Sequence, residues 1–347
     1  MTPDELTALS AREIADAEAG GLEVVHSADS RVLPRETEQF GFHDGIANPR
    51  IKGLRDSEAA IEPGEFLLGY VNEYQVYATR PRIRPSDDPS RILPLDEEET
   101  GAGDFGRNGS YLVVRQLKQD AFAFWSALDE RCAGNVAERE LLAAKMVGRW
   151  RSGAPLVKTW NADDPRLAFD DDFTYQRDDP HGLRCPIGAH IRRTNPRDAL
   201  DPDPGTQRSV DINKRHRIIR RGRPYGPPVT EPIEPIDPQR IIDAGPGYDH
   251  ADRGIFFMCF NANITRQFEF IQESWLNNRK FAGLCADTDP LMGDRAGESS
   301  TTASFTIPSE PVRWRVTGLP QFVHARGGAY FFMPGGRALR FLSLLPD

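Results

Sequence analysis

The chain has 347 residues, of which 39% are hydrophobic, and a formal net charge of -9 from 43 basic and 52 acidic side chains. This length allows about two domains, or one large domain whose core can enclose a cofactor. The acidic balance argues against nucleic-acid binding by the whole chain, and no apolar run approaches the roughly 18 to 20 residues of a membrane span. The N-terminal sequence is acidic and lacks the pattern of a secretion signal, which predicts a cytoplasmic protein.

The four cysteines are widely spaced and form no CxxC pair; they are Cys132, Cys185, Cys259 and Cys285. This spacing supports neither a zinc site nor a disulfide framework, so we expect reduced thiols.

Hydrophobic periodicity in the first half of the chain predicts a mixture of helices and strands. Their order is a helix over 1–18, a strand over 21–28, a strand over 64–78, a strand over 109–117, and helices over 118–134 and 138–150. A loop rich in glycine, asparagine and proline lies at residues 41–49. Residues 81–108 are polar and proline-rich, which predicts an ordered loop.

The second half begins with an irregular segment, residues 151–205, which is long for a loop without function. The basic segment 214–223 has two central isoleucines that favour a strand, and its charges could contact phosphate or line a pocket. Residues 253–275 predict a strand followed by a helix, and 326–345 predict a further strand and a C-terminal helix. Strands and helices alternate without a GxGxxG loop, so we expect an α+β fold with antiparallel sheets and no NAD site.

Three polar residues stand in segments that could carry chemistry. Asp44 lies in GFHDGIANP, His190 in CPIGAHIRRTNPRD, and Arg220 in IIRRGRPYG. Each has an ordinary structural interpretation when taken alone: an aspartate caps turns, a lone histidine is commonly structural, and adjacent arginines on a strand point to opposite faces.

Together, in this order, the three segments resemble the GxxDG, proximal-histidine and distal-arginine motifs of the dye-decolorizing peroxidases. The resemblance continues through GSYLVVRQLKQDAFAFW, GRWRSGAPLV, FMCFNANITRQFEFIQESWLNN, DTDPLMG and RGGAYFFMP. It therefore covers most of the chain after about Gly21, and it is similar to the longer-chain branch of the family.

The resemblance implies a dimeric α+β barrel-like fold of two ferredoxin-like units. We expect residues 1–150 to form the first unit, with the GxxDG loop, and residues 151–347 to form the second, heme-binding unit. Members of the family usually carry a longer segment before the GxxDG loop, so the first unit is expected to be truncated. A homo-oligomer could then supply the missing strand, or the first sheet could keep an exposed edge.

The resemblance also implies the roles of individual residues. His190 would be the axial ligand of heme iron, and Asp44 and Arg220 would act on hydrogen peroxide at the opposite face. Asp287 or Asp289 would support the histidine ring, since a carboxylate on its other nitrogen favours electron donation to the metal.

Further histidines and one arginine complete the candidates. Arg326 would contact a heme propionate, from charge complementarity. The alternative histidine ligands, without a supporting motif, are His181, His216, His250 and His324.

The expected function is that of a peroxidase that binds heme b. Hydrogen peroxide would be reduced, and dyes, phenolics or similar aromatic reductants oxidised, through an oxyferryl intermediate. Bulky reductants would deliver electrons through surface aromatic residues, although the sequence does not indicate which tryptophan is exposed. The alternatives are a heme-binding or heme-delivery protein with little turnover, and an acidic scaffold outside heme chemistry.

Overall fold

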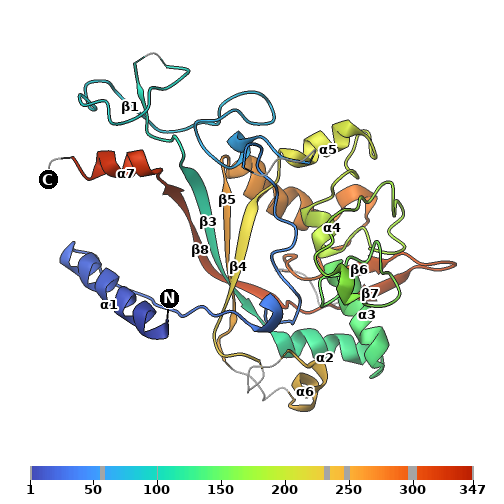
Figure 1. Cartoon of the computed structure of the whole chain (residues 1–347). Coiled ribbons are helices and arrows are strands. Elements are labelled where there is room, and N and C mark those ends of the chain that lie inside the picture. Colours follow the sequence, from blue (N-terminus) through green and yellow to red (C-terminus); the bar gives the residue numbers. More distant parts are fainter. Residues whose placement is uncertain are drawn as a thin grey trace.

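A four-stranded antiparallel sheet forms the centre of the computed structural model, in the order β4-β5-β3-β8 (Figure 1). The structure describes residues 2–54, 59–99, 101–229, 235–245, 251–295 and 303–345. The strands are β3 (Ser110–Gln119), β4 (Ile219–Tyr225), β5 (Gly254–Asn261) and β8 (Val323–Met333).

Helices α2 (Ala121–Arg131) and α3 (Val136–Val147) pack over one face of this sheet, and α3 contacts α4 (His190–Thr194) (Figure 1). The buried cluster joins Phe124, Trp125 and Leu128 of α2 to Leu117 of β3 and Val323 of β8. The Asp120 side chain caps α2 by accepting a hydrogen bond from the amide of Ala123. Burial of this aromatic face, rather than helix propensity, holds α2 against the sheet.

The end of α3 sets the position of α4. Gly148 terminates α3 with φ of 103°, a left-handed conformation that glycine adopts at no steric cost. A Cβ atom at this position would lie 2.4 Å from the Ile191 side chain on α4. The glycine therefore allows α4, which carries His190, to pack directly against the end of α3.

The remaining described elements surround this core. They are α1 (Pro3–Ala19), η1 (Pro34–Glu36), η2 (Pro63–Glu65), β1 (Arg82–Ile83), β2 (Gly103–Asp104), η3 (Pro165–Leu167), α5 (Gln207–Lys214), α6 (Pro238–Asp243), the π-helical turns η4 (Thr265–Glu269) and η5 (Ile271–Leu276), η6 (Phe281–Gly283), β6 (Ser304–Ile307), β7 (Trp314–Thr317) and α7 (Gly336–Leu342).

The predicted α+β class with antiparallel sheets is confirmed. The helix predicted over 1–18, the strand over 109–117 and the two helices that follow it are present as α1, β3, α2 and α3. Residues 151–205 are largely irregular, as expected, and still build a buried cluster that includes Trp150, Tyr175 and Ala189.

Two predicted strands are wrong. Residues 21–28 form no strand, and residues 64–78 form turns around η2. Both segments contain strand-forming residues, but neither finds a neighbouring strand, and a strand exists only where a ladder of hydrogen bonds forms. At the edge of β4, residues before the Asp44 loop make only isolated contacts. Ser30 forms a β-bridge with Tyr225, and the amide of Arg31 donates a hydrogen bond to the carbonyl of Pro224.

The central sheet takes β3 from the first 150 residues and its other three strands from the rest of the chain. The division into two units at residue 150 stays a prediction. Among the described residues, no helix has both the length and the apolar character needed to cross a bilayer.

Candidate active site

The loop that carries Asp44 is fixed to the edge of β4. The Asn48 side chain forms two hydrogen bonds with the backbone of Arg220, as a neighbouring strand would. Its oxygen accepts the amide hydrogen of Arg220 at 3.0 Å, and its nitrogen donates to the Arg220 carbonyl at 3.0 Å. Arg217 donates to the carbonyl of Ala47 at 2.8 Å. The amide of Asp44 itself donates to the carbonyl of Glu36. These contacts hold residues 44–48 in place although they form no regular element.

Asp44 and Arg220 form an ion pair with 2.5 Å between Oδ1 and Nη1. Both side chains retain solvent contact, with 24% of Asp44 and 31% of Arg220 exposed. Burial alone would raise the pKa of the Asp44 carboxyl, but the charge and hydrogen bond of Arg220, with the amide of Gly45, hold it below its usual value. Asp44 is therefore ionised in mildly acidic solution and can accept a proton.

Gly222 gives the Asp44 carboxylate its space. Residues 220 and 222 are two apart on β4, so both belong to the same face of the strand. A Cβ atom at position 222 would lie 2.4 Å from Oδ2 of Asp44 and 2.4 Å from the Ile255 side chain. No real Cβ atom tolerates such distances, so any other residue here would displace the carboxylate or the strand.

His190 begins α4 and contacts a buried carboxylate. Its Nδ1 lies 3.0 Å from Oδ2 and 3.3 Å from Oδ1 of Asp289. Asp289 also accepts the amide hydrogens of Leu291 and Met292, at 3.0 and 2.7 Å, and its side chain is fully buried. Burial would raise its pKa, but the charge and hydrogen bond of His190 outweigh that effect and lower it. Asp289 is therefore held as a carboxylate that keeps the Nδ1 proton in place.

Asp287 has a different position. Its carboxylate accepts hydrogen bonds from the hydroxyls of Ser304 and Thr306, and from the amide of Thr306. It therefore joins the segment before β6 to β6 itself. The sequence left both aspartates open as the partner of His190, and in the structure Asp289 makes the contact.

The donor set around His190 suits a heme iron. Within the described part of the chain, no hydrogen bond or ion pair involves Nε2 of the ring, and 26% of the side chain is exposed. A neutral imidazole whose Nδ1 proton faces a carboxylate presents the Nε2 lone pair, which is the arrangement of an axial heme ligand.

Known proteins give an independent comparison. No family model matches the chain. A dye-decolorizing peroxidase of Mycetinis scorodonius is 32% identical, over 92% of this chain and 60% of the relative. One from Auricularia auricula-judae is also 32% identical, over 86% and 56%. The chain belongs to the dye-decolorizing peroxidase family. It spans between 49% and 60% of the length of the curated relatives it matches.

Solved structures of dye-decolorizing peroxidases have the same fold. An ancestral D-type enzyme gives a TM-score of 0.65 at 31% identity, over 90% of this chain and 64% of the solved one. An enzyme from Auricularia auricula-judae gives 0.72 at 27% identity, over 96% and 72%. A dye-decolorizing peroxidase whose heme pocket was engineered for asymmetric sulfoxidation gives 0.73 at 27% identity, over 96% and 72%.

In this dye-decolorizing peroxidase fold, no hydrogen bond or ion pair within the described residues joins Arg326 to either residue pair. It is half exposed on β8, and its Nη2 is 3.8 Å from a carboxylate oxygen of Asp252. Among the alternative ligands, His216 stacks on Phe270 and its Nδ1 faces the carbonyl of Arg266, while His250 lies outside the described residues. The propionate contact of Arg326 stays a prediction.

A cluster of arginines beside the Asp44 loop went unnoticed in the sequence. Arg149 and Arg197 both donate to the carboxylate of Asp171, and Arg217 lies close to the same groups. Burial, together with the charge of Arg197, lowers the pKa of Arg217 to about 10. Two guanidinium groups thus bind this carboxylate and a third lies near it, which leaves two positive charges in excess among these four residues.

Glu38 is a further residue of this region that the sequence pattern did not predict. Its carboxylate accepts the amides of Phe40 and Phe42 and the side-chain amide of Gln119, so it shapes the backbone leading to Asp44. Burial, opposed by these hydrogen bonds, raises the pKa of Glu38 to about 7. Two of these residues left a signal in the sequence: Gly222 follows Arg220 at strand spacing, and Arg217 belongs to the basic segment 214–223.

Proposed function

We propose that this chain is a heme peroxidase that reduces hydrogen peroxide and oxidises dyes, phenolics or related aromatic compounds. The proposal rests on two residue pairs in one fold. His190 is supported by the buried carboxylate of Asp289, and the ionised Asp44 is held by Arg220. Membership of the dye-decolorizing peroxidase family supports this chemistry.

Heme b bound through Nε2 of His190 would supply the iron at which hydrogen peroxide reacts. Asp289 holds the Nδ1 proton of the ring, which keeps Nε2 unprotonated and increases its donor strength. The two positive charges in excess at Arg149, Arg197 and Arg217 match the two propionates of heme, whereas Arg326 already faces Asp252.

Asp44 would move the proton that peroxide cleavage requires. Cleavage of the O–O bond needs a proton to leave one oxygen and reach the other, which then departs as water. Asp44 is ionised and partly exposed, so it can accept the first proton and return it to the departing oxygen. Arg220 stays charged throughout and stabilises the negative charge that develops on that oxygen.

An absorption spectrum tests the proposal directly. The protein is reconstituted with heme in mildly acidic buffer, and the spectrum is recorded before and after one equivalent of hydrogen peroxide. We expect a Soret band that changes with peroxide and recovers when a dye is added. A Soret band that ignores peroxide would instead support the heme-binding alternative.

A further inference from the structure

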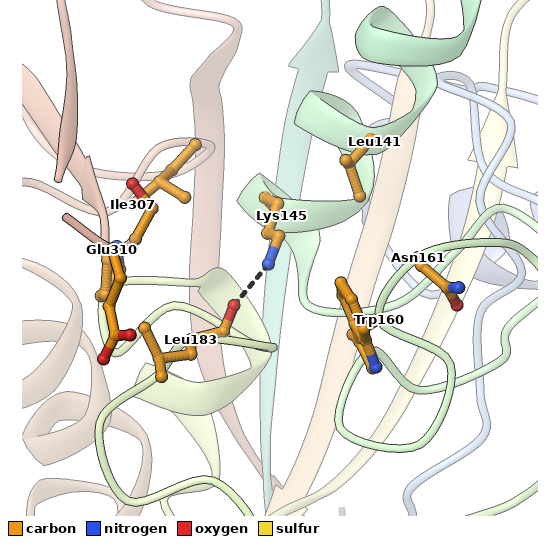
Figure 2. A pocket seen from close by; sticks show the side chains of 9 residues that line it. Leu141, Lys145, Trp160, Asn161, Leu183, Ile307 and Glu310 are labelled. Atoms are coloured by element: carbon orange, nitrogen blue, oxygen red, sulfur yellow. Dashed lines mark hydrogen bonds between the residues drawn. The ribbon is translucent and has the colours of Figure 1, made fainter. Parts of the chain in front are cut away.

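A pocket lies between α3, the irregular segment that follows it and the end of β6. It has a volume of about 570 Å³, within the range of small-molecule sites. Leu141 and Lys145, one turn apart on α3, form its floor, and Trp160 and Leu183 come from the irregular segment that follows (Figure 2). Ile307 and Glu310 close it at the end of β6. Most of the lining is thus aliphatic or aromatic, with Lys145 as its one cationic residue, Glu310 as its one acidic residue, and Asn161 and Ser309 as its neutral polar residues.

Lys145 is buried and forms no ion pair within the described residues; burial lowers its pKa, which the more distant charge of Asp179 partly opposes. Only 7% of its surface is exposed, and its Nζ donates to the carbonyls of Leu183 and Arg184 at 2.9 and 2.5 Å. No carboxylate among the described residues lies within 4 Å of it, and Glu310 is exposed at the rim. An ammonium has three hydrogens to donate, so one remains for a ligand. A buried charge of this kind is stabilised when an anion reaches it.

Trp160 provides a platform for a ring beside this charge. Its side chain is 52% exposed although it lines the pocket (Figure 2). An exposed indole face next to aliphatic walls is suited to stacking with a planar aromatic ring.

Trp160 is also connected to the interior. The indole N–H of Trp150, which is 6% exposed, donates at 2.6 Å to the carbonyl of Thr159, the group bonded to the Trp160 nitrogen. Trp150 packs in one buried cluster with Tyr175 and Ala189, and Ala189 directly precedes His190. A hydrogen bond to the backbone next to Trp160 and the packing of this cluster thus link the pocket to α4.

We propose that this pocket binds a phenolic carboxylate, with its ring on Trp160 and its carboxylate on Lys145. Resting on the proposed function, we infer in addition that the bound molecule delivers its electron through Trp160 and Trp150 toward heme at His190. One electron leaves the phenol and its proton goes to solvent water. Two such molecules supply the two electrons that convert one hydrogen peroxide into two waters.

Binding is measured first, without heme or peroxide, by calorimetric titration with 4-hydroxycinnamate and with its uncharged methyl ester. We expect saturable binding of the acid, at least tenfold weaker in Lys145→Met and in Trp160→Leu. The ester should bind wild type and Lys145→Met equally. Trp314→Leu is the matched control, because Trp314 is also exposed but does not line the pocket.

Because Trp160 is half exposed, we expect Trp160→Leu to fold, which keeps the test valid even if Lys145→Met unfolds. Equal affinity of wild type and Trp160→Leu for the acid, or no binding at millimolar concentration, would overturn the pocket. With heme bound, Trp160→Leu should lower turnover of 4-hydroxycinnamate about tenfold and leave turnover of iodide, a small reductant, unchanged. Equal losses for both reductants would overturn the electron route. Loss of all peroxide consumption in wild type would contradict the proposed function while leaving the binding result intact.

Discussion

The two carboxylates of the candidate active site differ in how they are held. Asp289 is fully buried and receives two backbone amides in addition to the ring of His190. Asp44 retains 24% exposure, and its carboxylate is held chiefly by the flexible side chain of Arg220. The first environment fixes a charge and keeps it from exchanging protons. The second allows a carboxylate to take up and release a proton, which is what a general acid–base group needs.

The largest effect is expected from removing the ring that Asp289 holds. His190→Ala should abolish the Soret band of the heme-reconstituted protein, because no other described group offers a nitrogen supported by a buried carboxylate. The absorption spectrum measures this directly. His324→Ala, at an exposed position on β8, should keep the band. Heme binding that survives unaltered in His190→Ala would mean that another residue is the ligand.

The variant Arg220→Leu tests the role of the partly exposed Asp44–Arg220 ion pair. Heme should remain bound, but the reaction with peroxide should slow by a factor on the order of 10² because a preorganised charge is lost. Stopped-flow absorbance measures the rate. Arg221→Leu is the matched control, since the neighbouring side chain points to the opposite face and is exposed.

The same variant predicts a change in pH dependence. Arg220 lowers the pKa of Asp44, and Asp44 acts as a base only when ionised, so activity is present above this pKa and lost as pH falls through it. Without the guanidinium, burial raises the pKa, and the acid limb of the pH-rate profile should move to higher pH. An acid limb that stays in place would remove Asp44 as the titrating base.

Asp289→Asn should act through His190 and with a smaller effect. A neutral amide cannot hold the Nδ1 proton as firmly, so heme affinity or peroxide reactivity should fall by about 10- to 100-fold. Heme titration and stopped-flow rates measure the two quantities. Asp287→Asn should affect thermal stability, because Asp287 binds Ser304 and Thr306, but leave the heme spectrum unchanged. A larger effect on heme binding in Asp287→Asn than in Asp289→Asn would mean that Asp287, rather than Asp289, supports His190.

The smallest effect is expected from Gly222→Ala. The added methyl group would approach Oδ2 of Asp44 to 2.4 Å, so the carboxylate must shift, and peroxide reactivity should fall about tenfold with heme affinity unchanged. Gly327→Ala on β8 is the control, because nothing lies within 4 Å of its Cβ position. Unaltered kinetics in Gly222→Ala would show that Asp44 tolerates displacement.

Local sequence pattern predicted both β3 and α2. The helix α2 has local stabilisation, since Asp120 caps it, whereas β3 depends on pairing with β5 and β8. The segment 21–28 has strand-forming residues too, but whether a strand forms depends on a partner that sequence pattern does not specify. The motifs likewise placed His190 near two aspartates, whereas the choice between Asp287 and Asp289 depends on the path of the backbone.

Charge clusters were the hardest feature to predict. Arg149, Arg197 and Arg217 lie far apart in the sequence and meet only around Asp171 in the folded chain. The shift of Glu38 arises from burial, which no neighbouring residue in the sequence indicates. Such groups acquire their properties from tertiary contacts alone.

Because Asn48 pairs with the backbone of Arg220, hydrogen exchange at the Arg220 amide reports opening of the loop that carries Asp44. The Arg220 N–H can exchange with deuterium only when the Asn48 oxygen leaves it, and that separation also releases the segment next to Asp44. Its exchange rate therefore reports the free energy of local opening. A spectroscopic probe at a single backbone position can thus report how often the acid–base group departs from its working place.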